Sequence, residues 1–297
     1  GCKPRSAGHH LQATWNHRMG VSVFGHRGAC GYLPENTMPS FELGFELGSD
    51  AIEFDVVLTK DSVPVILHDI DLTKTTNIVS HPALPTSVYE VTLEELKQLR
   101  VMERYPENRV ESAKFSGQFE IPTLRELLAN PKFDGTHLIL ELKDGKELHS
   151  RGLDLVGAVA KELVSSNWQE RGIQLTVESF EFSILKNAKT AFGGEIDFVF
   201  LSAPGTLPAG RTSLEDDLLK EIATEFDGVS VAIEMLWENE FVTRAKALGL
   251  KVFTYTARIE TAPGDVETWF EKLALSGVDG IFADQPDRLI KTVTRLS

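Results

Sequence analysis

Residues 24–69 read FGHRGACGYLPENTMPSFELGFELGSDAIEFDVVLTKDSVPVILHD, and the fold can be worked out from this stretch. A β-branched run at 21–24 predicts a strand that ends as the stretch begins. Apolar residues at 38–48 then predict a helix, which Gly48 ends. A second β-branched run at 51–58 predicts the next strand. This order of strand, helix and strand indicates an α/β protein.

Two carboxylates interrupt the apolar strand at 51–58. Glu53 and Asp55 are two residues apart, so their side chains point to the same face. Like charges held this close need a cation, a basic partner or a shared proton. An edge strand with two solvated acids would be the ordinary explanation, but the dense apolar neighbours favour an internal strand. We therefore predict a site for a hard cation such as Mg²⁺ or Ca²⁺.

Two histidines follow predicted strands on either side of this pair. His26 comes directly after the first strand, together with Arg27, and His68 follows the apolar run at 63–67. Histidine supplies both an acid and a base near neutral pH. Two of them at strand ends beside a carboxylate pair form a candidate catalytic group, and Asp69 stands next to the second one.

A third carboxylate comes at the end of the next predicted strand, 137–142. Glu141 and Lys143 share a face of that strand by the same two-residue rule. In isolation such a pair would be a surface ion pair. After a strand with two buried acids, we predict that Glu141 is a third metal ligand and that Lys143 supplies a cation beside it.

Strands and helices alternate regularly through the rest of the chain. Further strands are expected at 173–177, 197–201, 228–231, 251–255 and 280–282. Helices are expected at 146–166, 181–191, 214–224, 239–248 and 265–276, and Pro286 opens a last one. With 21–24, 51–58 and 137–142, this makes eight strands. Eight alternating units predict a closed (β/α)8 barrel of the TIM type, whose site lies at the C-terminal ends of the strands.

The domain organisation predicted from this pattern is simple. Residues 1–20 form a polar N-terminal leader, and residues 21–297 form a single barrel domain. Residues 70–120 are an insertion after the second strand, with a short helix at 93–100. A long loop at this end of a barrel is suited to act as a lid or as a wall that selects the substrate.

Eight ordered motifs resemble the glycerophosphodiester phosphodiesterase family. They are HRG at 26–28, PENT at 34–37, the ExD pair at 53 and 55, HD at 68–69, IPTL at 121–124, LELK at 140–143, ESF at 178–180 and GVDGIFADQP at 277–286. The resemblance implies a (β/α)8 barrel and a divalent metal. It also implies hydrolysis of glycerophosphodiesters to an alcohol and sn-glycerol 3-phosphate, through a cyclic phosphate that water then opens.

Roles follow for the residues singled out above. Glu53, Asp55 and Glu141 are predicted to bind one divalent cation, Ca²⁺ or Mg²⁺, with Mn²⁺ as a third option. A phosphodiester is anionic, and Arg27 and Lys143 are predicted to neutralise it. The acid–base pair is predicted to be His26 and His68, with the initial base left open.

Two departures from the family pattern concern the substrate pocket. Residues 253–256 read Phe-Thr-Tyr-Thr where the family often has Trp-Thr-Val-Asn, and residues 283–286 read Ala-Asp-Gln-Pro where it often has Thr-Asp-x-Pro. These changes leave the alcohol head group open. They also leave open two other functions: cleavage of lysophospholipids as a lysophospholipase D, and a catalytically inactive barrel that acts as a binding module. A metal-dependent barrel acting on sugars is disfavoured by the HRG and PENT motifs.

Composition sets the remaining bounds. The net charge of −14 argues against non-specific nucleic-acid binding and against strong attachment to anionic lipid, and no apolar run has transmembrane length. A small-molecule diester is the expected partner, and the oligomeric state stays open. Two cysteines do not make a disulfide framework, so Cys2 and Cys30 are predicted to be free thiols, with a bridge between them not excluded. The compartment is cytoplasmic, or periplasmic or secreted if an N-terminal signal has been removed.

Overall fold

The computed structural model of this chain describes residues 20–207, 211 and 213–297. The leader predicted at 1–20 therefore lies, apart from its last residue, outside the described part, and so does Cys2. Cys30 is buried and carries a free thiol.

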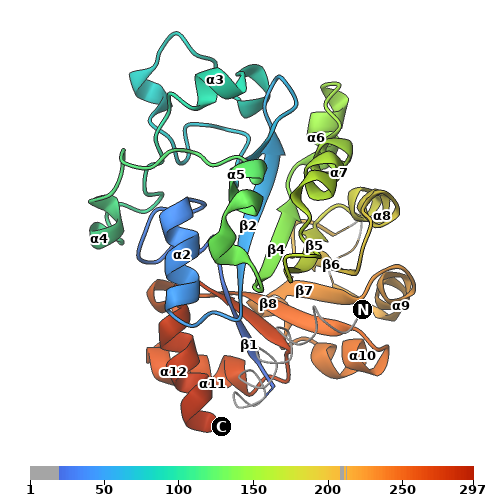
Figure 1. Ribbon diagram of the computed structural model, residues 1–297. Coiled ribbons are helices and arrows are strands. Elements are labelled where there is room, and N and C mark those ends of the chain that lie inside the picture. Colours follow the sequence, from blue (N-terminus) through green and yellow to red (C-terminus); the bar gives the residue numbers. More distant parts are fainter. Residues whose placement is uncertain (1–19, 208–210, 212) are drawn as a thin grey trace.

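Eight parallel strands close into a barrel, as the sequence predicts (Figure 1). The order around the ring is β1, β2, β4, β5, β6, β7, β8 and β9, and β1 pairs with both β2 and β9 to close it. The strands are β1 Ser22–Gly25, β2 Ala51–Leu58, β4 His137–Leu142, β5 Gln174–Ser179, β6 Ile196–Ser202, β7 Gly228–Ala232, β8 Lys251–Ala257 and β9 Gly280–Ala283. The run predicted at 63–67 is β3, Pro64–Ile66, which extends β2 as an antiparallel hairpin outside the ring.

Helices follow the strands around the outside of the barrel (Figure 1). They are α2 Met38–Glu46, α5 Leu124–Ala129, α6 Gly145–Ser150, α7 Leu155–Ser166, α8 Phe182–Ala191, α9 Asp216–Glu225, α10 Phe241–Ala247, α11 Val266–Ala274 and α12 Pro286–Leu296. The prediction of one helix over 146–166 is wrong, because α6 and α7 are separate. Gly152 lies between them with φ of +79°, a conformation that an α-helix does not contain.

Local sequence signals explain where several of these helices begin. Thr37 caps α2 by accepting a hydrogen bond from the Ser40 amide, and a proline follows it in the first turn. A reciprocal capping box starts α5, since the Thr123 hydroxyl bonds to the Glu126 amide while the Glu126 carboxylate bonds back to the Thr123 amide. Short-range chemistry therefore sets the helix starts, whereas burial holds the helices in place.

The inside of the barrel consists of an apolar layer with a polar layer above it. Phe24 packs against Phe253 and Phe282, with ring centroids 5.0 Å apart in both cases. Successive inward-facing residues of a strand are two positions apart. The next inward positions after Phe24 and Phe282 are therefore His26 and Asp284. This alternation places charged groups at the C-terminal end of the barrel, above an aromatic floor.

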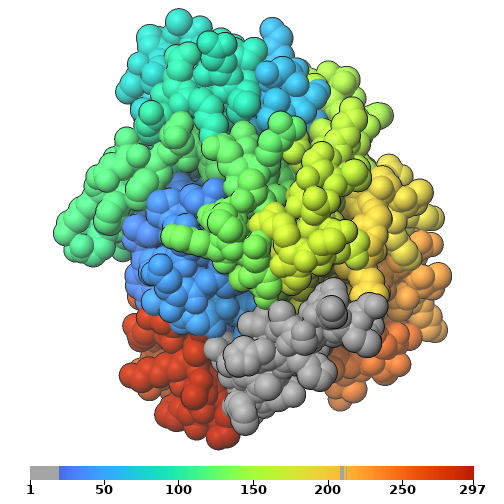
Figure 2. Space-filling model, in the orientation of Figure 1, coloured from blue at the N-terminus to red at the C-terminus, as the bar shows by residue number. Residues whose placement is uncertain are grey.

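The insertion covers this end of the barrel. Residues 70–120 contain only short helices: α3 Leu93–Leu96, α4 Val110–Ala113, η1 Ile78–Ser80 and η2 Val88–Glu90. The helix predicted at 93–100 is thus shorter than expected. Figure 1 shows α3 beyond the end of the barrel toward which β2 points and α4 at the left, level with β2, and Figure 2 shows the insertion forming one continuous body with the barrel. Among the described residues, no helix is long and apolar enough to span a membrane.

Candidate active site

The turn after β1 is held in a strained conformation that aims its backbone at the site. Arg27 has φ of +51°, which is uncommon for a residue with a side chain. Its amide donates to Glu53 Oε1 at 2.9 Å, so the turn is tied to β2. Gly28 is required beside it, because a Cβ there would lie 2.5 Å from the backbone of Ser40. Strain that the surroundings enforce in this way is typical of functional sites.

Three carboxylates meet where β2 and β4 run side by side. Asp55 is paired in register with Glu141, and Glu53 precedes Asp55 on the same face. One carboxylate oxygen from each residue lies within 4.8 Å of the others, and all three side chains are buried. We call Glu53, Asp55 and Glu141 the acid cluster. The two-residue rule read from the sequence thus agrees with the observed arrangement.

The acid cluster is short of positive charge. Burial and then the neighbouring carboxylates raise the pKa of Glu53 well above its ordinary value, and burial raises the pKa of Glu141 to about 8. Burial also acts on Asp55, but the charges of His68, Arg27 and Lys143 outweigh it and hold the pKa of Asp55 below the usual range. Ionisation is therefore favoured at Asp55 and opposed at Glu53 and Glu141.

A divalent cation fits this cluster. Among the described residues, no donor hydrogen-bonds to Asp55 Oδ1 or to Glu141 Oε2, although both atoms are buried. Buried acceptors without donors are rare in native proteins. A cation would satisfy both atoms and would remove the cost of placing three carboxylates together. An all-oxygen set suits Ca²⁺ or Mg²⁺.

Two cationic side chains lie beside the acid cluster. Arg27 Nε is 3.6 Å from Asp55 Oδ2, and Lys143 Nζ is 3.4 Å from Glu141 Oε2. Lys143 also lies 5.5 Å from the centroid of the Phe180 ring. Both cations are largely buried, and they are close enough to the cluster to contact an anion that a bound metal would also touch.

Each predicted catalytic histidine faces a carboxylate. His26 Nδ1 donates to Asp284 Oδ1 at 2.6 Å, and His68 Nδ1 lies 3.1 Å from Asp69 Oδ1. A carboxylate at Nδ1 orients the ring and leaves Nε2 for a substrate. The two pairs differ in exposure, since the His26 side chain is 10% exposed and that of His68 is 26% exposed. Burial lowers the pKa of His26, although Asp284 opposes this shift.

A cavity of about 290 Å³ joins these groups. Of the predicted site residues, five line it: His26, Arg27, Glu53, His68 and Glu141. Asp55 and Lys143 stand behind that wall, in contact with residues that form it. The aromatic side chains of Phe180 and Tyr255 line the same cavity, with ring centroids 6.2 Å apart.

Sequence reasoning missed several charged residues around the cavity. Asp284, Glu35 and Glu178 stand inside motifs that were recognised, but no role was assigned to them. Glu178 is paired in register with Glu141, is 2% exposed and lines the cavity. Its position directly at the end of a predicted strand was a usable signal. Arg104 had no such signal, because it lies in an irregular part of the insertion.

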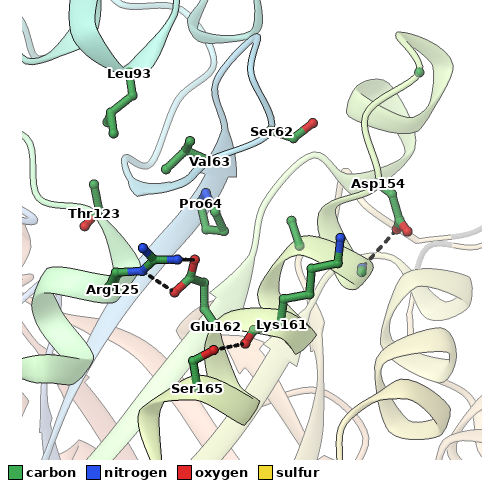
Figure 3. A pocket seen from close by; sticks show the side chains of 13 residues that line it. Ser62, Val63, Pro64, Leu93, Thr123, Arg125, Asp154, Lys161, Glu162 and Ser165 are labelled. Carbon is green, nitrogen blue, oxygen red and sulfur yellow. Dashed lines mark hydrogen bonds and ion pairs between the residues drawn. The ribbon is translucent and has the colours of Figure 1, made fainter.

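Two other places in the fold were considered and do not match this chemistry. His26, Cys30 and Asp284 could also surround an ion, but Arg109 and Arg258 already contact Asp284 there and disfavour a cation. A larger cavity, of about 570 Å³, lies between the β2–β3 turn, α5 and α7 (Figure 3).

The charged groups of that larger cavity are occupied with one another. Arg125 donates twice to Glu162, and Asp154 caps the amide of Gly157 at the start of α7 (Figure 3). No histidine lines it, and no acid cluster faces it among the described residues. The smaller cavity is therefore the candidate active site.

Comparisons with known proteins agree with this assignment. The model of the glycerophosphoryl diester phosphodiesterase family matches residues 26–288. A glycerophosphodiester phosphodiesterase from Caldanaerobacter subterraneus is 29% identical over 277 residues, which cover 93% of this chain and 99% of that protein.

Two solved structures are similar over nearly their whole lengths. A proposed glycerophosphoryl diester phosphodiesterase from Silicibacter pomeroyi has a TM-score of 0.77 and 28% identity, with 93% of this chain and 94% of that chain covered. A phosphodiesterase from Oleispira antarctica, solved with its product sn-glycerol-3-phosphate, has a TM-score of 0.70 and 26% identity, with 92% and 96% covered.

Proposed function

The chain belongs to the glycerophosphoryl diester phosphodiesterase family, and we infer its reaction from this membership. It is a phosphoric diester hydrolase, and its substrates are small glycerophosphodiesters. We propose that it releases an alcohol and sn-glycerol 3-phosphate. We also propose that residues 21–297 form one catalytic domain with an insertion at 70–120.

The acid cluster holds one divalent cation in this proposal. Glu53, Asp55 and Glu141 supply its oxygen ligands, and the ion, when bound, withdraws charge from the phosphate. Arg27 and Lys143 neutralise the remaining phosphate oxygens, and Arg27 can do so with two parallel hydrogen bonds. Support for this arrangement comes from the unsatisfied buried oxygens of Asp55 and Glu141.

His26 and His68 move the protons. In the first step the glycerol 2-hydroxyl oxygen forms a bond to phosphorus, and the bond from phosphorus to the alcohol oxygen breaks. One histidine takes the hydroxyl proton, while the other gives its proton to the departing alcohol. In the second step water attacks the cyclic phosphate, the phosphorus bond to the 2-oxygen breaks, and the two histidines exchange roles. Each returns to its starting protonation state.

One observation carries the proposal. Two histidines, each with a carboxylate at Nδ1, line the same 290 Å³ cavity as the acid cluster and Arg27. Acid–base catalysis, charge neutralisation and a metal-binding set are all needed to hydrolyse a stable phosphodiester. A binding module without activity would not need this combination, because it has no protons to transfer.

The test is an assay of the purified protein on glycerophosphocholine and glycerophosphoethanolamine, following release of glycerol 3-phosphate. It is run with Ca²⁺, with Mg²⁺ and with EDTA. We expect release that needs a divalent cation and that the Glu53→Ala variant loses. Glu42→Ala is the control, since Glu42 pairs with Lys132 away from the cavity. A folded protein that releases no product from either substrate with either metal would contradict the proposal.

A second candidate substrate class is the lysophospholipids. It is favoured by exposed hydrophobic side chains on the insertion, where Tyr105, Val110 and Phe115 are 41%, 58% and 37% exposed. These residues flank Arg109, which reaches the site by contacting Asp284. An acyl chain could rest on such a surface. Release of choline from lysophosphatidylcholine, lost in a Val110→Asp variant that still cleaves glycerophosphocholine, would support this class.

A further inference from the structure

One short segment of the insertion reaches both catalytic histidines through carboxylates. We call residues 103–109 the strap. From it, Arg104 Nη2 donates to Asp69 Oδ2 at 2.5 Å, and Arg109 Nη2 donates to Asp284 Oδ2 at 2.6 Å. Asp69 and Asp284 are the two carboxylates that face the histidines. The strap therefore spans the two histidine–carboxylate pairs, whose carboxylates, Asp69 and Asp284, are far apart in the sequence.

Each aspartate uses one oxygen for its histidine and the other for the strap. Asp284 Oδ1 accepts from His26, while Oδ2 accepts from Arg109 and from Arg258. Asp69 Oδ1 lies against His68, while Oδ2 accepts from Arg104. An arginine on the second oxygen fixes the plane of the carboxylate. The carboxylate then orients the imidazole, through a hydrogen bond from His26 to Asp284 and through a 3.1 Å contact between His68 and Asp69.

The strap is itself held firmly. Glu103 is buried, and its carboxylate accepts from the Ser112 hydroxyl at 2.5 Å and from the Tyr105 amide at 2.8 Å. The Arg109 amide donates to the Tyr105 carbonyl at 2.8 Å, which closes one turn of chain. These bonds fix the spacing between the two arginines, so that the strap acts as a rigid spacer.

Both arginines make further bonds to protein atoms, Arg109 with its Nε and Nη1 atoms and Arg104 with its Nε and Nη2 atoms. Arg109 bonds to Glu260 at 2.9 Å and to the Cys30 carbonyl at 3.1 Å. Arg104 makes two bonds to Glu35, which on its other side binds Arg27. Neither strap arginine is among the residues that line the cavity. Direct binding of the substrate phosphate by these two arginines is therefore disfavoured.

We propose that Arg104 and Arg109 are positioning residues: they hold His68 and His26 in register with the substrate by clamping Asp69 and Asp284. The inference rests on the proposed function, since the roles of the two histidines do. It gives the insertion a task beyond covering the site. The insertion aligns the acid and the base with each other, because one rigid segment grips both of their carboxylates.

The experiment uses Arg104→Gln and Arg109→Gln with two substrates. One is glycerophosphocholine, whose alcohol must be protonated to leave. The other is the p-nitrophenyl ester of glycerol 3-phosphate, whose nitrophenolate leaves without a proton. On glycerophosphocholine we expect kcat to fall about 10- to 100-fold in each variant, as for small misplacements of a catalytic group, with KM nearly unchanged.

The two variants should differ on the nitrophenyl ester. Nitrophenolate leaves in the first step, so the comparison uses the single-turnover rate of its release. The arginine that serves the histidine acting as the acid in that step becomes dispensable there, so its variant should recover nearly the full wild-type rate. The arginine that serves the general base is still needed, so the other variant should lose as much as before. This asymmetry also identifies which histidine is the first base. A merely structural role for the strap would lower activity on both esters alike.

Three controls separate positioning from folding. Arg100→Gln is matched, because Arg100 lies in the insertion but donates only to the backbone carbonyls of residues 97 and 99. Arg104→Lys and Arg109→Lys keep the charge with a single donor group, and each should retain more of kcat than the corresponding glutamine variant, with KM unchanged. The double variant Arg104→Gln with Asp69→Asn should lose little more kcat than either single variant, because both changes break the same contact between Arg104 and Asp69.

Several results would overturn the proposal. They are equal losses on both esters in both variants, a rise in KM without a change in kcat, and wild-type activity after either substitution. If the fold-losses in kcat of Asp69→Asn and Arg104→Gln multiplied in the double variant, Arg104 would act through Glu35 and not through Asp69. If the unaltered protein cleaved neither ester, the proposed function itself would fail, and that result is distinct from an active protein that tolerates loss of the strap arginines.

Discussion

Two groups of buried charge meet at Arg27, which lines the cavity, and they are built in opposite ways. The acid cluster gathers three carboxylates, two of which have raised pKa values because burial and like charge oppose their ionisation. The second group is centred on Glu35, which binds Arg27 and Arg104. Both oxygens of the Glu35 carboxylate accept hydrogen bonds from these two guanidinium groups. We call these three residues the paired network.

The difference separates buried charges that the fold pairs within itself from buried charges that a bound ligand would pair. In the paired network the protein supplies both signs, and the desolvation cost of each charge is offset within the fold. In the acid cluster the three carboxylates outnumber the two neighbouring cations, Arg27 and Lys143, and among the described residues Asp55 Oδ1 and Glu141 Oε2 accept no hydrogen bond. A bound cation would complete such an imbalance, and this supports the metal site proposed for the acid cluster.

The largest expected effect removes the cation from the acid cluster. In Glu53→Gln, or in EDTA, activity should fall at least about 10⁴-fold, since a metal contributes several kcal/mol to transition-state stabilisation. Calorimetric titration should show weaker Ca²⁺ or Mg²⁺ binding. In EDTA the variant should melt at a higher temperature than the wild type, because glutamine avoids the cost of burying or protonating a carboxylate among two others. If Glu53→Gln melted at a lower temperature than the wild type in EDTA, the contrast between the acid cluster and the paired network would be wrong. Glu42→Gln is the matched control.

The second largest effect is expected when His68, which lies outside the acid cluster, is replaced. His68→Ala should lower kcat about 10³-fold, within the usual range for general acid–base catalysis. Metal affinity and the melting temperature should change little, because His68 is partly exposed and is not a member of the acid cluster. His149→Ala, on an exposed helix, should leave kcat unchanged. Loss of metal binding in His68→Ala would show that the two groups of charge are not separate.

A third prediction tests the paired network through pH. Burial opposes ionisation of Glu35, but Arg27 and Arg104 outweigh it and hold its pKa at about 2, below its ordinary value of 4.5. A lowered pKa in the fold stabilises the protein fully above about pH 4.5, and this stabilisation is lost as the pH falls toward about 2. Glu35→Gln should therefore cost about 3 kcal/mol at pH 7, as when a buried ion pair loses one partner.

The measurement is unfolding in urea at pH 7 and at pH 3. The difference in unfolding free energy between wild type and Glu35→Gln should narrow at pH 3, because protonation of the unfolded wild-type chain then competes with its folding. An equal difference at both pH values would mean that Glu35 contributes by packing and not by its charge.

The smallest expected effect lies far from both groups. Arg125 pairs with Glu162 at the surface of the larger cavity, where its side chain is 75% exposed (Figure 3). Solvent and salt screen such a pair. Arg125→Gln should leave the melting temperature and kcat at their wild-type values. A clear loss of activity would give the larger cavity a role in the reaction that its chemistry does not suggest.

Much of the fold and half of the site are readable from local sequence. The strand at 51–58 has the predicted bounds, and so does the strand at 137–142. The alternation rule placed Glu53 and Asp55 on one face, and parallel strands brought Glu141 to the same end of the barrel. These inferences succeed because they depend on periodicity and on strand direction, which neighbouring residues alone decide.

Tertiary structure alone decided the rest. The contact between Arg109 and Asp284 joins residues 175 positions apart, and the contact between Arg104 and Asp69 joins residues 35 apart. No period or motif marks Arg104 or Arg109, since irregular chain carries no repeating pattern. The sequence by itself determined a barrel with carboxylates and histidines at its strand ends. Which arginines compensate which carboxylates was settled only when the insertion folded over that end, because charge pairing depends on distance in space and not on distance along the chain.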